Sequence, residues 1–95
     1  MPGLVSVFTP THDPRWLEEC HRSLRRQAYT NWEWVILPSG PEALQLPEAV
    51  VEDKRVRILP RSGQHSVGAL KAECCRNCRG DLLVELDHDD FLTPD

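Results

Sequence analysis

Apolar residues along this chain gather in short runs, and polar, proline-rich or glycine-containing stretches separate them. Four of the runs are rich in β-branched, aromatic and leucine residues, and each predicts a strand. The four predicted strands cover residues 4–8, 32–37, 56–59 and 82–86. The last of them contains neither glycine nor proline and is expected to be mostly buried. A proline follows each of the first three runs, at Pro10, Pro38 and Pro60, and is expected to end the strand.

Between the strands, apolar residues recur with helical spacing. Residues 17–28 predict one amphipathic helix, and Asp13 followed by Pro14 suits an N-cap with proline at the first helical position. Residues 66–79 predict a second helix, with Gly80 as its C-terminal stop. Each of these helices then connects two predicted strands along the chain.

The stretch 42–54 is ambiguous because Pro47 interrupts it, and it is expected to hold a short helix and a loop. The predicted order is strand, helix, strand, loop, strand, helix, strand. This alternation is typical of an α/β fold in which helices cover a parallel sheet. No internal repeat, low-complexity tract or interdomain linker interrupts it, so residues 1–95 are expected to form a single domain or subdomain.

The composition is that of an ordinary soluble protein, with 40% hydrophobic and 27% charged residues. The net charge of -4 provides no global basic field, so a nucleic-acid partner is not expected. Two arginine clusters, at residues 22–26 and 55–61, are interpreted as a solvated helix face and a polar loop. The sequence shows neither a signal-peptide pattern nor an apolar run long enough to cross a membrane. A cytoplasmic location is therefore expected, and a longer parent protein could still lie peripherally on the inner membrane face.

The cysteines allow two interpretations, since disulfides are not expected without a secretion signal. Cys75 and Cys78 have the CxxC spacing of a structural zinc site, but no second pair follows them. Val67, Leu70, Cys74 and Cys78 also share one helical stripe. Small buried thiols between a helix and a sheet explain this pattern well, so packing is favoured over zinc.

An acidic cluster, Asp-His-Asp-Asp, follows the fourth predicted strand directly at residues 87–90. Open α/β sheets bind their ligands at the carboxyl ends of their strands. Crowded carboxylates there repel one another, and a hard divalent cation relieves that repulsion. These residues alone leave two interpretations open: a metal–diphosphate site, or a solvated acidic turn that caps a helix. Within the strand, Glu85 is expected to lie at a sheet edge or to face a basic residue.

Three segments, taken together, resemble the amino-terminal half of a family 2 glycosyltransferase with the A-type fold. They are Val-Ser-Val-Phe-Thr-Pro-Thr-His at residues 5–12 with Tyr-Thr-Asn-Trp-Glu at 29–33, Gly-Ala-Leu-Lys at 68–71 with Arg-Gly-Asp at 79–81, and Leu-Asp-His-Asp-Asp at 86–90. The resemblance spans nearly the whole chain. It implies a three-layer, Rossmann-like open sheet of about four mostly parallel strands. It also implies an inverting transfer of a sugar from a UDP- or GDP-linked donor to an acceptor hydroxyl.

The resemblance further implies where the nucleotide binds. In the loop after the first strand, Pro10, Thr11 and His12 are expected to contact the base and ribose. Lys71 is expected to lie near the nucleotide. Such proteins usually carry an aspartate pair after the second strand, where this chain has Ser39 instead. Ser39 is retained as a candidate ligand of the base or ribose.

For the acidic cluster, the resemblance implies a divalent-metal site. Asp87 is expected to contact the ribose or sugar and to share in metal binding, and Asp89 to bind Mg²⁺ or Mn²⁺ on the diphosphate. A cation there stabilises the charge on the departing nucleoside diphosphate. The acceptor, a sugar or a lipid, is not specified by these residues.

The general base of such transferases lies downstream of the Asp-X-Asp triplet, so no catalytic base is expected within residues 1–95. The chain is therefore interpreted as a nucleotide-sugar-binding subdomain that ends after the triplet and is not catalytically complete by itself. The alternative from another class is a nucleotide-binding or regulatory module without catalysis. Uncovered apolar surface on such a subdomain predicts self-association.

Overall fold

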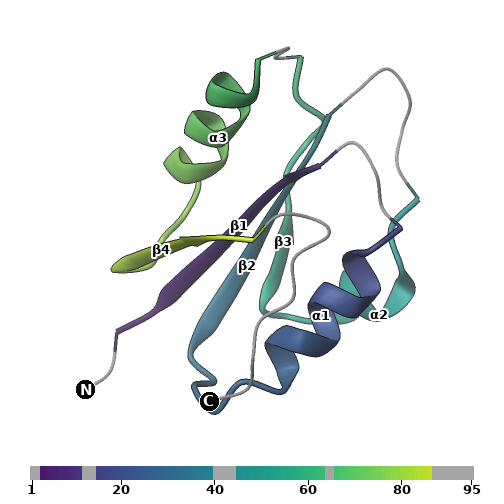
Figure 1. Ribbon diagram of the computed structural model, residues 1–95, viewed down its shortest axis with the longest axis vertical. Coiled ribbons are helices and arrows are strands. Elements are labelled where there is room, and N and C mark those ends of the chain that lie inside the picture. The colour runs from purple at the N-terminus through teal and green to yellow at the C-terminus, as the bar shows by residue number, and fades with distance from the viewer. Residues whose placement is uncertain (1–2, 12–14, 40–44, 64–65, 87–95) are drawn as a thin grey trace.

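The computed structural model describes residues 3–11, 15–39, 45–63 and 66–86. These residues form a four-stranded parallel sheet with helices on both faces (Figure 1). The elements are β1 (Val5–Thr11), α1 (Leu17–Arg25), β2 (Trp32–Pro38), α2 (Glu48–Glu52), β3 (Val56–Ile58), α3 (Val67–Arg76) and β4 (Leu82–Glu85). The predicted α/β class, with its Rossmann-like open sheet, is therefore confirmed.

The strand order β3-β2-β1-β4 places the first strand inside the sheet. Val7 of β1 lies opposite Trp34 of β2 on one side and opposite Val84 of β4 on the other. β2 and β3 follow one another outward from β1, and the chain then returns to place β4 on the opposite side. The strand order thus reverses between β1 and β4. In open α/β sheets, ligands bind at the carboxyl ends of the strands beside such a reversal.

Three layers result, because α1 and α2 cover one face of the sheet and α3 covers the other (Figure 1). β2 is buried at every position, which explains why its sequence is nearly continuous in apolar residues. The buried side chains between the sheet and the helices α1 and α2 include Leu17, Leu24, Trp34, Ile36 and Val50. Those under α3 are Phe8, Val35, Leu37 and Cys74.

The first strand is longer than predicted, because Pro10 lies inside β1 rather than after it. Pro10 is opposite Leu37 of β2. The backbone N–H of a residue at this position would point toward β4, as does the carbonyl of Phe8, which accepts from the N–H of Leu86. β4 ends at Glu85, opposite Phe8, so the missing N–H falls beyond the paired part of the two strands. The ends of the other strands differ from the prediction by a single residue.

The first helix begins at Leu17, where the predicted apolar spacing begins, and it ends earlier than predicted, at Arg25. Trp16 is at its N-cap position and makes no side-chain capping bond. Asp13 and Pro14 were predicted to supply the N-cap and the first helical position. Asp13 and Pro14 themselves lie outside the described residues. Leu17, the first helical residue, is completely buried, and the helix therefore begins where the side chains enter the core. The short α2 confirms the helix expected near Pro47, which is its N-cap residue.

The second long helix, α3, begins after Ser66, whose hydroxyl accepts from the N–H of Ala69 at 3.1 Å. It ends at Arg76 with Asn77 as its C-cap, so the prediction that Gly80 stops this helix is wrong. Gly80 instead lies against the start of β1, where an added Cβ would be 2.5 Å from the carbonyl oxygen of Leu4 and 2.7 Å from the backbone N of Ser6. The missing side chain thus permits the turn into β4 to pack against the sheet.

β4 was predicted to be mostly buried, and this is wrong for its first half. In the described residues β4 is an edge strand, and Leu82 and Leu83 are 58% and 44% exposed. Leu86, directly after the strand, is buried. Val67 is also exposed, so the apolar stripe of α3 begins later than its spacing predicted. No helix in the described part of the chain is long and apolar enough to span a membrane.

Candidate functional site

The carboxyl ends of β1 and β2 lie side by side, with Thr11 opposite Pro38. The backbone N–H of Ser39 donates to the carbonyl of Thr11 at 2.9 Å, and the Ser39 hydroxyl lies 3.4 Å from the same oxygen. Both side chains are almost fully buried. The structure therefore brings together two of the residues predicted to contact the nucleotide, and Pro10 immediately precedes them.

A third loop joins this edge through Ser62, which follows β3. Its backbone N–H donates to the carbonyl of Pro38 at 2.8 Å, and its hydroxyl donates to Glu73 of α3 at 2.7 Å. Sequence reasoning missed this link, because a serine and a glutamate eleven residues apart give no periodic signal. The result is that three loops and α3 are connected at the carboxyl edge of the sheet.

Lys71 of α3 reaches the end of β4. Its Nζ lies 2.8 Å from Oε2 of Glu85, and both side chains are partly exposed. Glu85 was expected to lie at a sheet edge or to face a basic residue, and in the described part of the sheet it does both. This pair places a lysine ammonium beside the strand that leads into Asp87. His12, Asp87 and Asp89 themselves lie outside the described residues.

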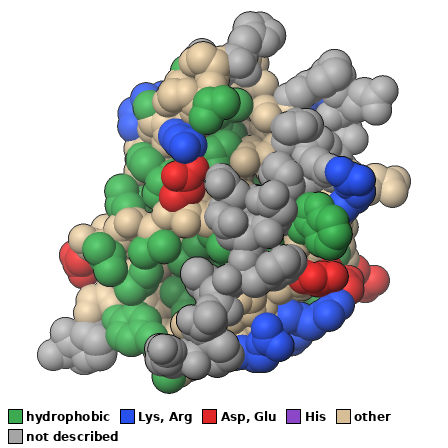
Figure 2. Space-filling view, viewed as in Figure 1, with side chains coloured by type: hydrophobic (Ala, Val, Ile, Leu, Met, Phe, Trp, Pro, Cys, Tyr) green, Lys and Arg blue, Asp and Glu red, His purple; other side chains and the backbone are tan. Residues whose placement is uncertain are grey.

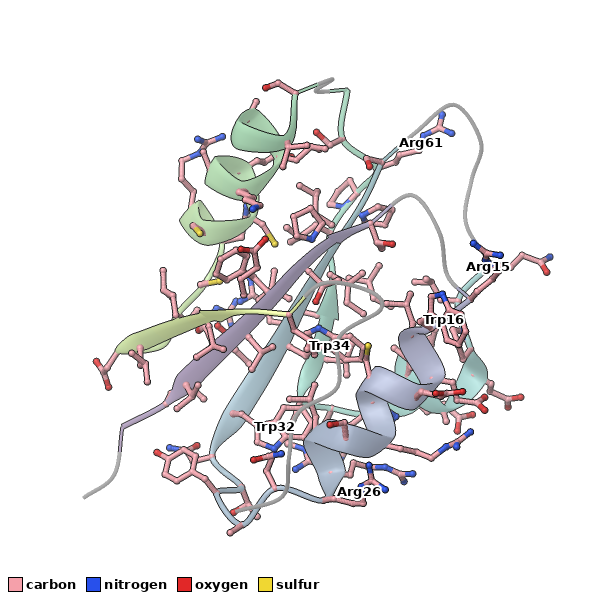
Figure 3. The ribbon with its side chains drawn as sticks, in the orientation of Figure 1. Arg15, Trp16, Arg26, Trp32, Trp34 and Arg61 are labelled. Carbon is pink, nitrogen blue, oxygen red and sulfur yellow. The ribbon has the colours of Figure 1, made fainter. Side chains whose placement is uncertain are left out.

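Thr9 connects β1 to its two neighbouring strands through its hydroxyl. The indole Nε1 of Trp34 donates to Thr9 Oγ1 at 2.8 Å, and this hydroxyl donates to the carbonyl of Leu86 at 2.5 Å. All three residues are buried, and Trp34 lies between the sheet and α1 (Figure 3). Trp34 packs in the core beneath α1, and sequence reasoning gave Thr9 no role. Thr9 lies directly after the apolar run at residues 4–8, and nothing in the sequence distinguishes its hydroxyl from those of Ser6 and Thr11.

His21 of α1 stacks on Trp34, with ring centroids 6.1 Å apart, and its Nε2 lies 2.7 Å from Oδ2 of Asp53. Its Nδ1 is buried and has no hydrogen-bond partner among the described residues. Burial alone would raise the pKa of Asp53, but hydrogen bonds from Arg55 and His21 lower it to about 2. The pair fixes α1 against the segment that follows α2.

The opposite, amino-terminal edge of the sheet carries a polar network around Glu33. Its carboxylate accepts from the Ser6 hydroxyl at 2.6 Å, from Arg57 at 2.9 Å and from the backbone N–H of Arg79 at 2.6 Å. Burial would raise the pKa of Glu33, but these hydrogen bonds and the Arg57 charge hold it below its usual value. The interpretation of the arginine cluster at residues 55–61 as a polar loop is therefore wrong for Arg57, which lies in β3, is 25% exposed and also donates to the carbonyl of Asn77.

The cysteines of α3, and Cys78 directly after it, pack against the sheet as predicted. Cys74 is buried, and its thiol lies 3.5 Å from the carbonyl oxygen of Val35. Burial raises the pKa of Cys74 to about 12, and it raises the pKa of Cys78 as well. Both thiols are therefore protonated at neutral pH, which suits apolar packing. Among the described residues, no three His, Cys, Asp or Glu side chains are grouped so that they could hold a metal ion.

Similarity to known proteins extends over nearly the whole chain. The sequence profile of glycosyl transferase family 2 matches residues 6–95. The O-antigen biosynthesis protein RfbC of Myxococcus xanthus is 33% identical over 96% of this chain and 8% of its own length. Chondroitin synthase of Escherichia coli is 31% identical over 97% of this chain and 14% of its own length. The putative colanic acid biosynthesis glycosyl transferase WcaA of E. coli K12 is 26% identical over 96% of this chain and 34% of its own length. The chain thus spans between 8% and 34% of the length of these relatives.

Proposed function

Because the chain belongs to glycosyl transferase family 2, we propose that residues 1–95 are the donor-binding part of an inverting glycosyltransferase. In this proposal the chain binds a UDP- or GDP-linked sugar at the carboxyl edge of its sheet. The observation that carries it is the reversal of strand order between β1 and β4, which lies beside the loops of Thr11 and Ser39. Ligands bind at this place in open α/β sheets.

The nucleoside is proposed to contact the end of β1 and the loop after it, where Pro10, Thr11 and His12 follow one another. The hydrogen bond between Ser39 and the Thr11 carbonyl supports this assignment, because it holds the two loops together before a ligand arrives. Ser39 stands where an acidic residue is usual in similar proteins. A hydroxyl can donate one hydrogen bond and accept others, and it carries no charge, so discrimination between uracil and guanine is expected to be weaker here than with a carboxylate.

Lys71 is proposed to supply positive charge close to the diphosphate. Its ion pair with Glu85 supports this role, because the pair directs the ammonium toward the end of β4 rather than toward bulk solvent. Lys71 is partly exposed, so an incoming phosphate has access to it. The lysine then interacts with two kinds of anion, the glutamate of β4 and the donor phosphates.

Asp87 and Asp89 are proposed to hold Mg²⁺ or Mn²⁺. Their carboxylate oxygens are the donors that these hard cations prefer, and they follow β4 directly, so the donor set fits the metal. When bound, the cation would stabilise the negative charge on the departing nucleoside diphosphate. The chain's own contribution is to bring two carboxylates to the end of an ordered strand.

The acceptor is proposed to be a growing saccharide, since the relatives are named for O-antigen, chondroitin and colanic acid synthesis. A general base must remove the proton of the acceptor hydroxyl, and the proposal assigns this base to a segment beyond residue 95. Residues 1–95 are then a donor-binding subdomain that does not turn over alone. Its location is proposed to be cytoplasmic, where nucleotide sugars are made.

A nuclear magnetic resonance titration of this chain with Mn²⁺ and UDP, and separately with GDP, tests the proposal. Paramagnetic broadening is expected around Asp87 and Asp89 and at Thr11. Asp89→Asn should weaken the metal-dependent binding by about 10-fold or more. Asp81→Asn is the matched control, because Asp81 is an exposed aspartate before β4, at the other edge of the sheet. A folded chain that binds neither nucleotide with Mn²⁺ would contradict the donor-binding role.

A further inference from the structure

The hydroxyl of Thr9 lies inside the apolar layer between the sheet and α1, at the point where β1 and β4 part. It has two hydrogen-bond partners, the indole N–H of Trp34 and the carbonyl of Leu86. Thr9 and Trp34 are completely buried, and Leu86 is 1% exposed. A buried hydroxyl needs such partners, and these two fix it between neighbouring strands.

The direction of these hydrogen bonds follows from the chemistry of tryptophan. An indole N–H is a donor only, so the Thr9 oxygen must accept from Trp34. The single hydroxyl proton of Thr9 is then directed to the Leu86 carbonyl at 2.5 Å. Trp34 is itself held by its stacking on His21. The Thr9 hydroxyl is therefore the donor to the Leu86 carbonyl, and its O–H bond has a single orientation.

The backbone ladder does not supply this contact. The N–H of Leu86 donates to the carbonyl of Phe8, so the next donor in a continuing parallel ladder would be the N–H of residue 10. Residue 10 is proline and has no N–H. The Thr9 hydroxyl thus binds the carbonyl that Pro10 leaves without its ladder partner. It extends the connection between β1 and β4 by one residue, as far as the peptide unit of Leu86.

We propose that Thr9 is a positioning residue for the carboxylates that follow β4, a role that rests on the proposed function. The Leu86 carbonyl belongs to the planar peptide group that leads into Asp87. Holding this oxygen fixes the orientation of that peptide plane, and with it the direction in which the chain leaves the sheet. Thr9 touches neither nucleotide nor metal. It acts through Leu86 on the placement of Asp87 and Asp89, which hold the cation in the proposed site.

The test compares Thr9→Val, which keeps the shape and removes the hydroxyl, with Thr9→Ser, which keeps the hydroxyl. In Thr9→Val, the amides of residues 86–89 should exchange with solvent faster, while the rest of β1 and β2 keeps its protection. The Kd for UDP or GDP with Mn²⁺ should rise about tenfold, and the Kd without metal should stay the same. Thr9→Ser should restore both quantities to within about twofold of the wild type.

Val7→Ala is the matched control, because Val7 lies on the same face of β1, is buried and has no polar group. It should lower the melting temperature without changing the ratio of the two Kd values. Trp34→Phe removes the donor to Thr9. It should change the amide exchange and the metal-dependent Kd in the same direction as Thr9→Val does. It therefore serves as a second variant if Thr9→Val does not fold.

Two outcomes would overturn the proposal. One is that Thr9→Val leaves both amide exchange and the metal-dependent affinity unchanged. The other is that Val7→Ala changes them as much as Thr9→Val does, since that result would assign the effect to general loss of stability. If the wild-type chain binds no nucleotide, the donor-binding role fails by itself. The exchange of residues 86–89 in the Val and Ser variants then decides the positioning role separately.

Discussion

At the scale of single residues, Gly80 shows how a missing side chain can fix a turn. An added Cβ would lie 2.5 Å from the Leu4 carbonyl and 2.7 Å from the backbone N of Ser6, and these backbone atoms cannot move aside. Gly80→Ala should therefore lower the free energy of unfolding by about 1–3 kcal/mol. Urea denaturation followed by circular dichroism measures this change.

Gly68 provides the control for that measurement, because it lies in the exposed first turn of α3 with no atom within 4 Å of an added Cβ. Gly68→Ala should raise the free energy of unfolding by up to about 1 kcal/mol, since alanine is the better helix former. Equal effects of the two substitutions would show that contact with β1 does not determine the need for glycine at position 80.

Asp53 predicts a pH dependence of stability. Its pKa of about 2 in the folded chain lies below the ordinary value of 3.8, so folding favours the carboxylate. The stabilisation is fully present above about pH 4 and is lost as the pH falls from 3.8 toward 2. Asp53→Asn should cost about 2 kcal/mol at pH 7 and little at pH 2, as measured by urea denaturation at each pH.

Glu52→Gln is the matched control for Asp53→Asn, because Glu52 is the exposed carboxylate next to it. It should leave the pH profile of the wild type nearly unchanged. A difference between wild type and Asp53→Asn that stays constant from pH 7 to pH 2 would contradict the ionic explanation and would assign the effect to packing.

At the scale of elements, the network around Glu33 joins β1, β2, β3 and the connection from α3 to β4. Arg57 is 25% exposed and Glu33 is 8% exposed, so removing the arginine leaves a buried carboxylate without its counter-charge. Arg57→Met should therefore cost about 3 kcal/mol in unfolding free energy. The exposed pair of Arg22 and Glu18 is the control, and Arg22→Met should cost less than about 1 kcal/mol.

A double variant separates the charge from the packing in this network. With Glu33→Gln present as well, Arg57→Met no longer leaves a buried charge, so the second substitution should cost clearly less than it does alone. Equal costs in the two backgrounds would show that Arg57 stabilises the sheet through its contact with the Asn77 carbonyl instead.

The sequence was sufficient to place each strand and helix. Buried strands appear as short apolar runs, and buried helix faces appear as apolar residues with helical spacing. Their ends were harder to predict. Local sequence patterns predict that Pro10 ends the first strand. Pro10 nevertheless lies within β1, because its missing N–H falls beyond the end of β4. Leu82 and Leu83 read as buried, and only the strand order shows that they lie on an edge of the described sheet.

The candidate site was predictable to the same extent. Parallel strands bring their carboxyl ends together, so the meeting of Thr11 with Ser39 followed from the order of elements. The links of Thr9 to Leu86 and of Ser62 to Glu73 did not follow, because they depend on which face of each strand and helix a polar side chain occupies. Such contacts between distant positions leave no pattern in one sequence.

At the scale of the whole molecule, apolar surface gathers around β4. Figure 2 shows hydrophobic side chains over β4 and the neighbouring part of β1. Leu82, the first residue of β4, is 58% exposed. Beside them lies an apolar cavity of about 230 Å³, lined by residues of β1, β2, β4 and the end of α1, including Val5, Trp32 and Val84. An edge strand with exposed leucines and unpaired backbone groups is a template for association with another chain.

We therefore expect this chain to self-associate through β4. The weight-average mass in sedimentation equilibrium should rise with concentration, and Leu82→Lys should weaken the association several-fold, because a lysine on an edge strand opposes pairing. Val51→Lys is the matched control: Val51 of α2 is 53% exposed, and its replacement adds the same charge at a distance from β4. If Val51→Lys weakens association as much as Leu82→Lys, net charge rather than the β4 surface controls it. A wild-type monomer at high concentration would contradict the prediction altogether.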